Sequence, residues 1–67
     1  MSKKPRVKED DEVKILEGLK AHVVATEDDE VVVETEDGRP KWIKTARLKL
    51  VASDASHQVW AELPEAA

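Results

Sequence analysis

The sequence predicts a mainly β protein, a small five-stranded barrel with a 3₁₀ turn before its last strand and a short C-terminal helix. Three observations carry this prediction. From residue 12 onward, short runs rich in β-branched residues alternate with turn signals, and three consecutive valines stand at positions 31–33. Asp37-Gly38 separates two of these runs, as in a tight hairpin. Closure into a barrel would remove the edges that so small a sheet otherwise leaves exposed.

Five strands are expected, and their turns follow from local residue chemistry. The first two, 12–16 and 19–26, are separated by Glu17-Gly18. The third and fourth, 31–36 and 40–44, are joined by Asp37-Gly38, for which we predict a type I′ turn with positive φ at both residues. Residues 45–47 are long enough only for a single 3₁₀ turn, and 48–51 form the last strand. Alternation along these strands predicts an inward-facing core of Val13, Ile15, Leu19, Ala21, Val23, Val31, Val33, Ile43, Leu48 and Leu50.

The two ends of the chain differ in composition and residue pattern from the predicted barrel domain, residues 12–51. Residues 1–11 combine high charge with one proline, which predicts a flexible arm. Residues 52–67 predict a helical tail that is capped by Ser53 or Asp54 and stopped by Pro64. Its apolar face would dock on a second apolar patch outside the barrel and bury Trp60 there. That face comprises Val59, Trp60 and Leu63, and the patch comprises Val24, Val32 and Trp42.

Bulk composition limits the class of protein. The 67 residues allow one domain, and 40% hydrophobic content with only two aromatic residues, both tryptophan, gives a thin core. The chain has no cysteine, so disulfides and thiolate metal sites are excluded. Apolar runs are too short for a membrane span or a signal peptide, and we expect a soluble cytoplasmic protein.

The stretch VVVETEDGRPKWIKTARLKLV, residues 31–51, resembles the second half of a Src-homology-3-like barrel. More narrowly, residues 12–51 are similar in pattern to the carboxy-terminal domain of retroviral integrases, especially the gammaretroviral type. The specific part of this likeness rests on Trp42, Ile43, Leu48 and Lys49. The connection between the first two strands is shorter here, and there is no Tyr or Phe for a polyproline-binding groove. The resemblance implies a Src-homology-3-like fold and nucleic-acid binding. It implies no enzyme activity, because integrase catalysis belongs to a different domain.

A basic strip surrounds one tryptophan in residues 37–50 and is the leading candidate site. Its cations would contact phosphates of DNA or RNA while the tryptophan stacks on a base. The strip comprises Arg39, Lys41, Trp42, Lys44, Arg47 and Lys49, with the arm cations Lys3–Lys8 as a possible extension. The net charge of −4 predicts weak binding. The alternative interpretation is that these charges keep strand edges soluble and that Trp42 is buried under the tail.

Two acidic blocks, Glu9–Glu12 and Glu27–Glu30, support a second hypothesis, a protein-interaction adaptor or inhibitor whose acidic face engages a basic partner. A third is a scaffold without a natural ligand, for example a designed barrel. No enzyme is predicted, because no serine or carboxylate has a plausible catalytic partner. His22 and His57 lack the spacing of metal ligands. The sequence therefore predicts a non-enzymatic binding module without metal, cofactor or small-molecule substrate.

Overall fold

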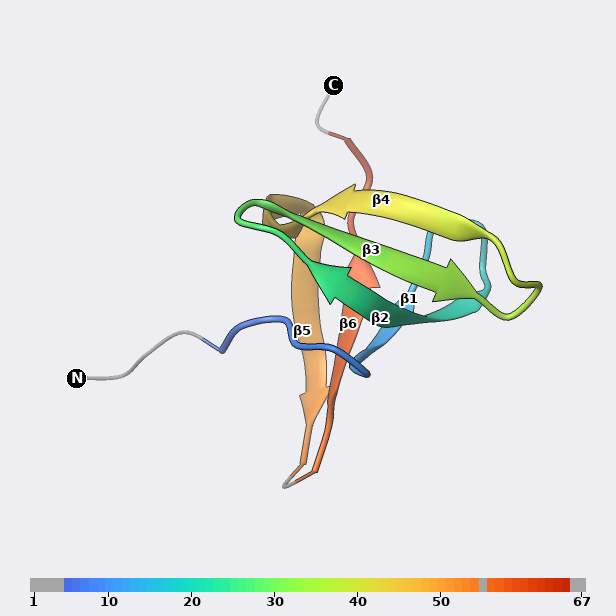
Figure 1. Ribbon diagram of the computed structural model, residues 1–67. Coiled ribbons are helices and arrows are strands. Elements are labelled where there is room, and N and C mark those ends of the chain that lie inside the picture. Colours follow the sequence, from blue (N-terminus) through green and yellow to red (C-terminus); the bar gives the residue numbers. More distant parts are fainter. Residues whose placement is uncertain (1–4, 55, 66–67) are drawn as a thin grey trace.

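Six β-strands and one 3₁₀ turn form the computed structural model, which describes residues 5–54 and 56–65. The strands are β1 (Glu12–Lys14), β2 (Lys20–Thr26), β3 (Glu30–Thr35), β4 (Pro40–Lys44), β5 (Leu48–Ser53) and β6 (Gln58–Glu62), with the 3₁₀ turn η1 (Thr45–Arg47) between β4 and β5. They make one sheet in the order β4-β3-β2-β1-β6-β5. All neighbours are antiparallel except β1 and β6, which are parallel. The sheet is strongly curved, so that β2–β4 run across the β5–β6 hairpin (Figure 1).

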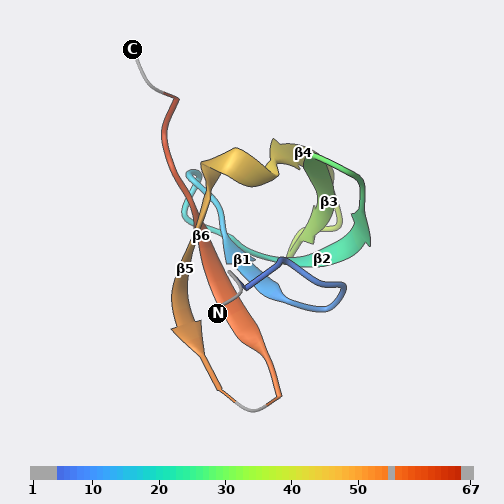
Figure 2. The same ribbon diagram turned by 90° about the vertical axis from the view of Figure 1, so that its left-hand side faces the viewer.

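The predicted mainly β fold is confirmed, and η1 and β4 begin and end at the predicted residues. The closed five-stranded barrel is wrong. A closed barrel has no edge strands, because the first and last strands of its sheet pair with each other. Here the sheet ends at β4 and β5, which do not pair, and the unpredicted strand β6 separates β5 from β1. β4 and β5 therefore remain as two edges of an open sheet, although the sheet curls far enough to enclose a core (Figure 2).

The predicted C-terminal helix is also wrong, because residues 58–62 form β6. Asp54 Oδ1 does accept bonds from the backbone N–H groups of Ser56 and His57, both at 2.9 Å, as a helix cap would. The same side-chain-to-backbone bonds also stabilise turns, and here they hold the β5–β6 turn. Beyond the turn, Trp60 and Glu62 point inward while Ala61 between them is less buried. This period of two identifies a strand.

Both glycines occupy turns of one kind. In the β3–β4 turn, Gly38 N donates to Thr35 O at 2.9 Å and Thr35 N donates to Arg39 O at 2.9 Å. Gly38 has φ +84°, whereas Asp37 is not among the residues with positive φ. The hairpin is where it was predicted, but the type I′ turn is wrong. The loop is a three-residue type I turn whose last residue is left-handed, and Gly18 (φ +89°) completes the same pattern between β1 and β2.

The core agrees closely with the predicted one. All predicted core residues are buried except Leu19 and Leu50, which are partly buried against it. Trp60 completes the core with only 6% of its surface exposed. It was predicted to be buried against Trp42, Val24 or Val32, which is wrong, because those three residues form the outer face of the sheet. The outer patch itself is present as expected, with Trp42 59% and Val24 43% exposed.

The ends of the chain are described in part. Residues 5–11 lie along the body, where Asp10 N donates to Val23 O at 2.9 Å and Val7 packs against the core. Residues 1–4 of the predicted arm, with Lys3 and Lys4, lie outside the described residues, as do Ala55 and residues 66–67 of the predicted tail.

Candidate interaction surface

The residues of the predicted basic strip differ in their surroundings in the structure, and two of its cations are paired with carboxylates inside the molecule. Lys41 lies on the inward side of β4, and its Nζ is 2.8 Å from both Glu17 Oε1 and Glu62 Oε1. Arg47, on η1, has Nη2 3.3 Å from Glu62 Oε2 and donates from Nε and Nη2 to Leu63 O. These two cations of the strip are thus bound within the molecule.

Glu62 is the centre of this ion-pair cluster, which was not recognised from the sequence. Its side chain is only 1% exposed, and its Oε1 also accepts the backbone N–H of Leu16 at 3.1 Å. Burial lowers the pKa of Lys41, but the hydrogen bonds to Glu17 and Glu62 outweigh that effect and hold it above its usual value. We call Glu62, Lys41, Arg47 and Glu17 the seam cluster, because it joins β4 to β6 across the open side of the sheet.

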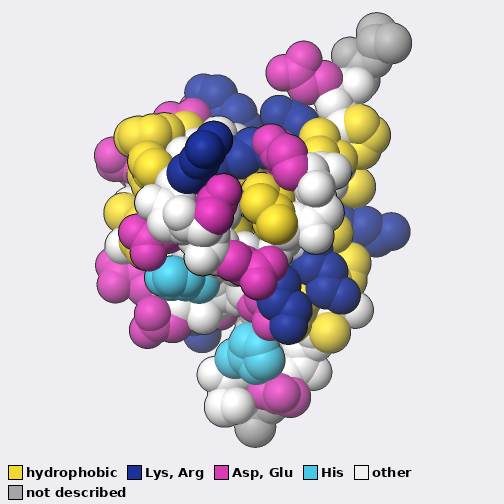
Figure 3. Space-filling view, turned by 90° about the vertical axis from the view of Figure 1, so that its right-hand side faces the viewer, with side chains coloured by type: hydrophobic (Ala, Val, Ile, Leu, Met, Phe, Trp, Pro, Cys, Tyr) yellow, Lys and Arg dark blue, Asp and Glu magenta, His cyan; other side chains and the backbone are white. Residues whose placement is uncertain are grey.

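The other cations of the strip are exposed. Arg39 pairs with Asp37 at 3.6 Å and Lys44 pairs with Asp29 at 3.6 Å, both near the surface, where such pairs contribute little. Lys49 has no ion pair within the described residues. On the face shown in Figure 3, acidic and basic side chains are interspersed and hydrophobic side chains reach the surface between them. The structure therefore does not gather the predicted cations on one continuous surface.

Trp42 is the member of the strip with an apolar neighbourhood. It lies opposite Val32 in the β3–β4 ladder, and Val32 lies opposite Ala25 in the β2–β3 ladder. A bulge between Val23 and Ala25 adds Val24 to the same side. We call Trp42, Val32, Ala25 and Val24 the apolar row. It crosses three strands on the outer face; Trp42 and Val24 at its two ends are exposed, and Val32 and Ala25 between them are partly buried.

The second predicted acidic block borders the apolar row. Residues 27–29 form the turn between β2 and β3 and Glu30 begins β3; a 2.7 Å bond from Glu27 N to Glu30 O closes the turn. Glu30 lies opposite Lys44, two residues from Val32 on the same face of β3. We call residues 27–30 the acidic turn. Glu30 therefore lies beside the apolar row and Asp29 pairs with Lys44 there, whereas Glu27 and Asp28 line the groove inside the curl of the sheet.

The first acidic block has a structural member. Asp11 is 4% exposed, and its Oδ2 accepts Trp60 Nε1 at 3.0 Å, Gln58 Nε2 at 2.9 Å and Lys8 N at 2.9 Å. Burial raises the pKa of Asp11, but these hydrogen bonds outweigh it and the pKa lies below its ordinary value. Asp11 therefore fastens the N-terminal segment to β6.

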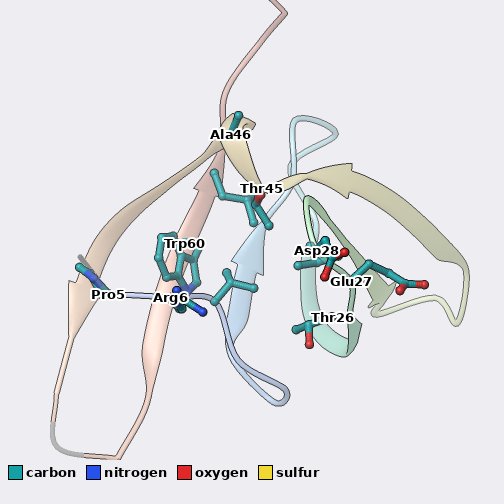
Figure 4. Close-up of a pocket in the computed structure, with 11 residues that line it drawn as sticks. Pro5, Arg6, Thr26, Glu27, Asp28, Thr45, Ala46 and Trp60 are labelled. Atoms are coloured by element: carbon teal, nitrogen blue, oxygen red, sulfur yellow. The ribbon is translucent and has the colours of Figure 1, made fainter. Parts of the chain in front are cut away.

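An open groove of about 790 Å³ lies inside the curl of the sheet (Figure 4). Trp60 from β6 faces it on one side, Glu27 and Asp28 lie on the other, and Thr45 of η1 borders it above. Its apolar lining combines the buried core residues Val31, Leu48 and Trp60 with Pro5, Val7 and Ala46, which are exposed or partly buried, and residues 5–7 of the N-terminal segment run along it.

Within residues 5–54 and 56–65, no group of three or more His, Asp or Glu side chains is arranged to hold a metal ion. His57 lies 3.7 Å from Asp54 and 4.0 Å from Glu12, and His22 is exposed on β2. In the same residues no helix is long and apolar enough to cross a membrane. Comparisons with protein-family models, with curated proteins and with solved structures give no match.

Proposed function

We propose that the protein is a non-enzymatic protein-binding module whose apolar row and acidic turn together receive a basic segment with an apolar anchor. The observation that carries this proposal is the exposure of Trp42. The chain has a small core and only two tryptophans, yet one of them, Trp42, is 59% exposed on β4, opposite Val32 of β3. Exposed aromatic and aliphatic groups that form a continuous patch are typical of interaction sites, and tryptophan is enriched among the residues that dominate binding energy.

The charges around the row favour a basic partner. On the side of the row the acidic turn supplies Glu30 and Asp29, whereas Lys44, the cation on the same side of β4 as Trp42, lies 3.6 Å from Asp29. Carboxylates at the rim of an interface accelerate encounter with a cationic partner and disfavour an anionic one. The net charge of −4 also attracts a cationic partner and repels an anionic one. These charges support the adaptor hypothesis over the nucleic-acid hypothesis.

Nucleic-acid binding remains the second candidate, supported by the exposed indole of Trp42 and by Lys44 on the same side of β4. A base can stack on an indole regardless of its sequence. With Lys41 and Arg47 held in the seam cluster, few cations are left for phosphates, and weak, strongly salt-dependent binding is expected.

The test is a selection of random peptides displayed on phage, run in parallel on the native protein and on Trp42→Ala. Leu16→Ala, which removes an apolar side chain of similar exposure (51%) outside the row, is the matched control. We expect enriched peptides that are rich in Lys and Arg with a large apolar residue, and that bind the native protein and Leu16→Ala but not Trp42→Ala. Peptides that bind all three proteins equally, or that carry no positive charge, would contradict the proposal. Salt-titrated binding of single-stranded DNA and RNA tests the second candidate.

A further inference from the structure

β5, the edge strand opposite β4 in the sheet, is less protected than β4 from Leu50 to its end at Ser53. One side of β5 pairs with β6, and its other side has no neighbouring strand in the sheet. Within residues 5–54 and 56–65, no hydrogen bond reaches that free side from another element. In an antiparallel ladder every second residue directs its N–H and C=O away from its partner, so β5 presents unpaired backbone groups along this edge.

Edge strands of monomers usually carry charges, prolines or a cover that prevents pairing with another chain. β4 follows this rule, since it begins with Pro40 and contains Lys41 and Lys44. In β5, no charge or proline occurs from Leu50 to Ser53, and Val51 is 49% exposed. A bulge between Leu50 and Ala52 also leaves Val51 outside the ladder with β6. The outer half of the β5–β6 hairpin projects from the body, away from β2–β4 (Figures 1 and 2).

We propose that two copies of this chain associate through antiparallel pairing of β5 with β5, which joins their sheets into one. The charges at the ends of the strand identify the occupant as a second copy. Because of the bulge, Val51 and Ala52 together occupy one position of the strand, and Leu50 and Ser53 lie on either side of it. When Leu50 lies opposite Ser53 of the second copy, Lys49 therefore lies opposite Asp54 of the second copy. Two-fold symmetry then repeats this oppositely charged pair at the other end.

Both members of the pair are available for it. Lys49 is exposed and has no ion pair within the described residues. Hydrogen bonds from Ser56 and His57 hold the pKa of Asp54 below its usual value, so it is ionised at neutral pH. The apolar row lies toward β4, the opposite edge of the sheet, and remains free in each copy.

The test is sedimentation velocity over a wide range of protein concentration, with Val51→Lys as the disruptive variant. Val24→Lys is the matched control, because Val24 is also a valine at a bulge and is similarly exposed, but on β2. We expect the native protein and Val24→Lys to dimerise as concentration rises, and Val51→Lys to weaken association about tenfold or more through like charges on the paired edge. Asp54→Asn, which keeps the oxygen that holds the turn, should weaken it less and make it less sensitive to salt.

A native protein that stays monomeric at every concentration would refute the proposal. So would dimers that resist Val51→Lys, or that are lost with Val24→Lys. Amide hydrogen exchange of the native protein gives an answer that depends on no variant. The exchange of Leu50 and Ser53 should slow as concentration rises, and unchanged exchange in a dimeric sample would place the interface elsewhere.

Discussion

Replacing Glu62 by Gln tests whether the seam cluster stabilises the open side of the sheet. The substitution keeps the size of the side chain and an oxygen that can accept the backbone N–H of Leu16, but it removes the negative charge between Lys41 and Arg47. Both cations then remain beside a neutral amide. Lys41 retains Glu17, which is itself exposed, and Arg47 retains Glu65, which is 82% exposed.

The expected loss of stability follows from the burial of the three side chains. Removing one partner of a buried ion pair typically costs about 3–5 kcal/mol, since a charge is left uncompensated. Glu62 is 1% exposed, but Lys41 and Arg47 are 26% and 28% exposed and can regain some hydration. We therefore expect the lower end, about 3 kcal/mol. In a domain of this size about 1 kcal/mol lowers Tm by about 4–8 °C, so Tm should fall by more than about 12 °C.

Urea and thermal unfolding measure this loss, with Trp60 fluorescence in a Trp42→Phe background as the signal. Glu65→Gln is the matched control, because it removes a carboxylate that lies 3.8 Å from the same Arg47 but in solvent. It should change the free energy of unfolding by less than about 0.5 kcal/mol. Equal effects of Glu62→Gln and Glu65→Gln would refute the assignment of Glu62 as the centre of the cluster.

Four further outcomes are expected. Trp60→Phe should cost about 1–3 kcal/mol in urea unfolding, because Asp11 loses the indole N–H that it accepts; an unchanged midpoint would contradict this. Because the folded-state pKa of Asp11 is lowered, its stabilisation is present above its unfolded pKa of about 3.9 and is lost as pH falls through the folded value. The stability difference between the native protein and Asp11→Asn should therefore shrink below about pH 4, and a constant difference would refute it. Gly18→Ala and Gly38→Ala should each cost about 1–2 kcal/mol by thermal unfolding through strain at positive φ alone, since an added Cβ meets no atom within 4 Å; a neutral effect would refute the assigned turns. Lys44→Glu should abolish any oligonucleotide binding and leave binding of a basic peptide undiminished, as measured by fluorescence titration; a loss of peptide binding would count against the acidic-turn proposal.

Strand positions from β1 to β5 were predictable because the residues that build them obey a simple alternation. Val31 and Val33 are buried and Val32 between them is less so, as a half-buried strand requires. The chain after β5 did not follow that rule. In β6 the inward-facing neighbours of Trp60 are Gln58 and Glu62, which are polar, so the apolar alternation that identifies a strand is missing.

The candidate surface was predictable only in part, for a related reason. Charge alone groups Lys41 and Arg47 with Lys44, because all three are close in sequence. Their separation depends on Glu62, which is distant in sequence and becomes their partner only when β6 folds against β1. The outward position of Trp42, in contrast, follows from its place between Lys41 and Ile43 on one strand, and it was predicted correctly.

The most direct test of the proposed function is a ¹⁵N–¹H NMR titration of the two indole N–H signals with a basic peptide obtained from the display selection. The exposed Trp42 should shift with increasing peptide, together with the amides of Val32 and of the acidic turn. The Trp60 signal, whose N–H is held by Asp11, should stay in place. A peptide that binds without moving the Trp42 signal, or a Trp42 signal that moves with oligonucleotides but with no peptide, would contradict the proposed function.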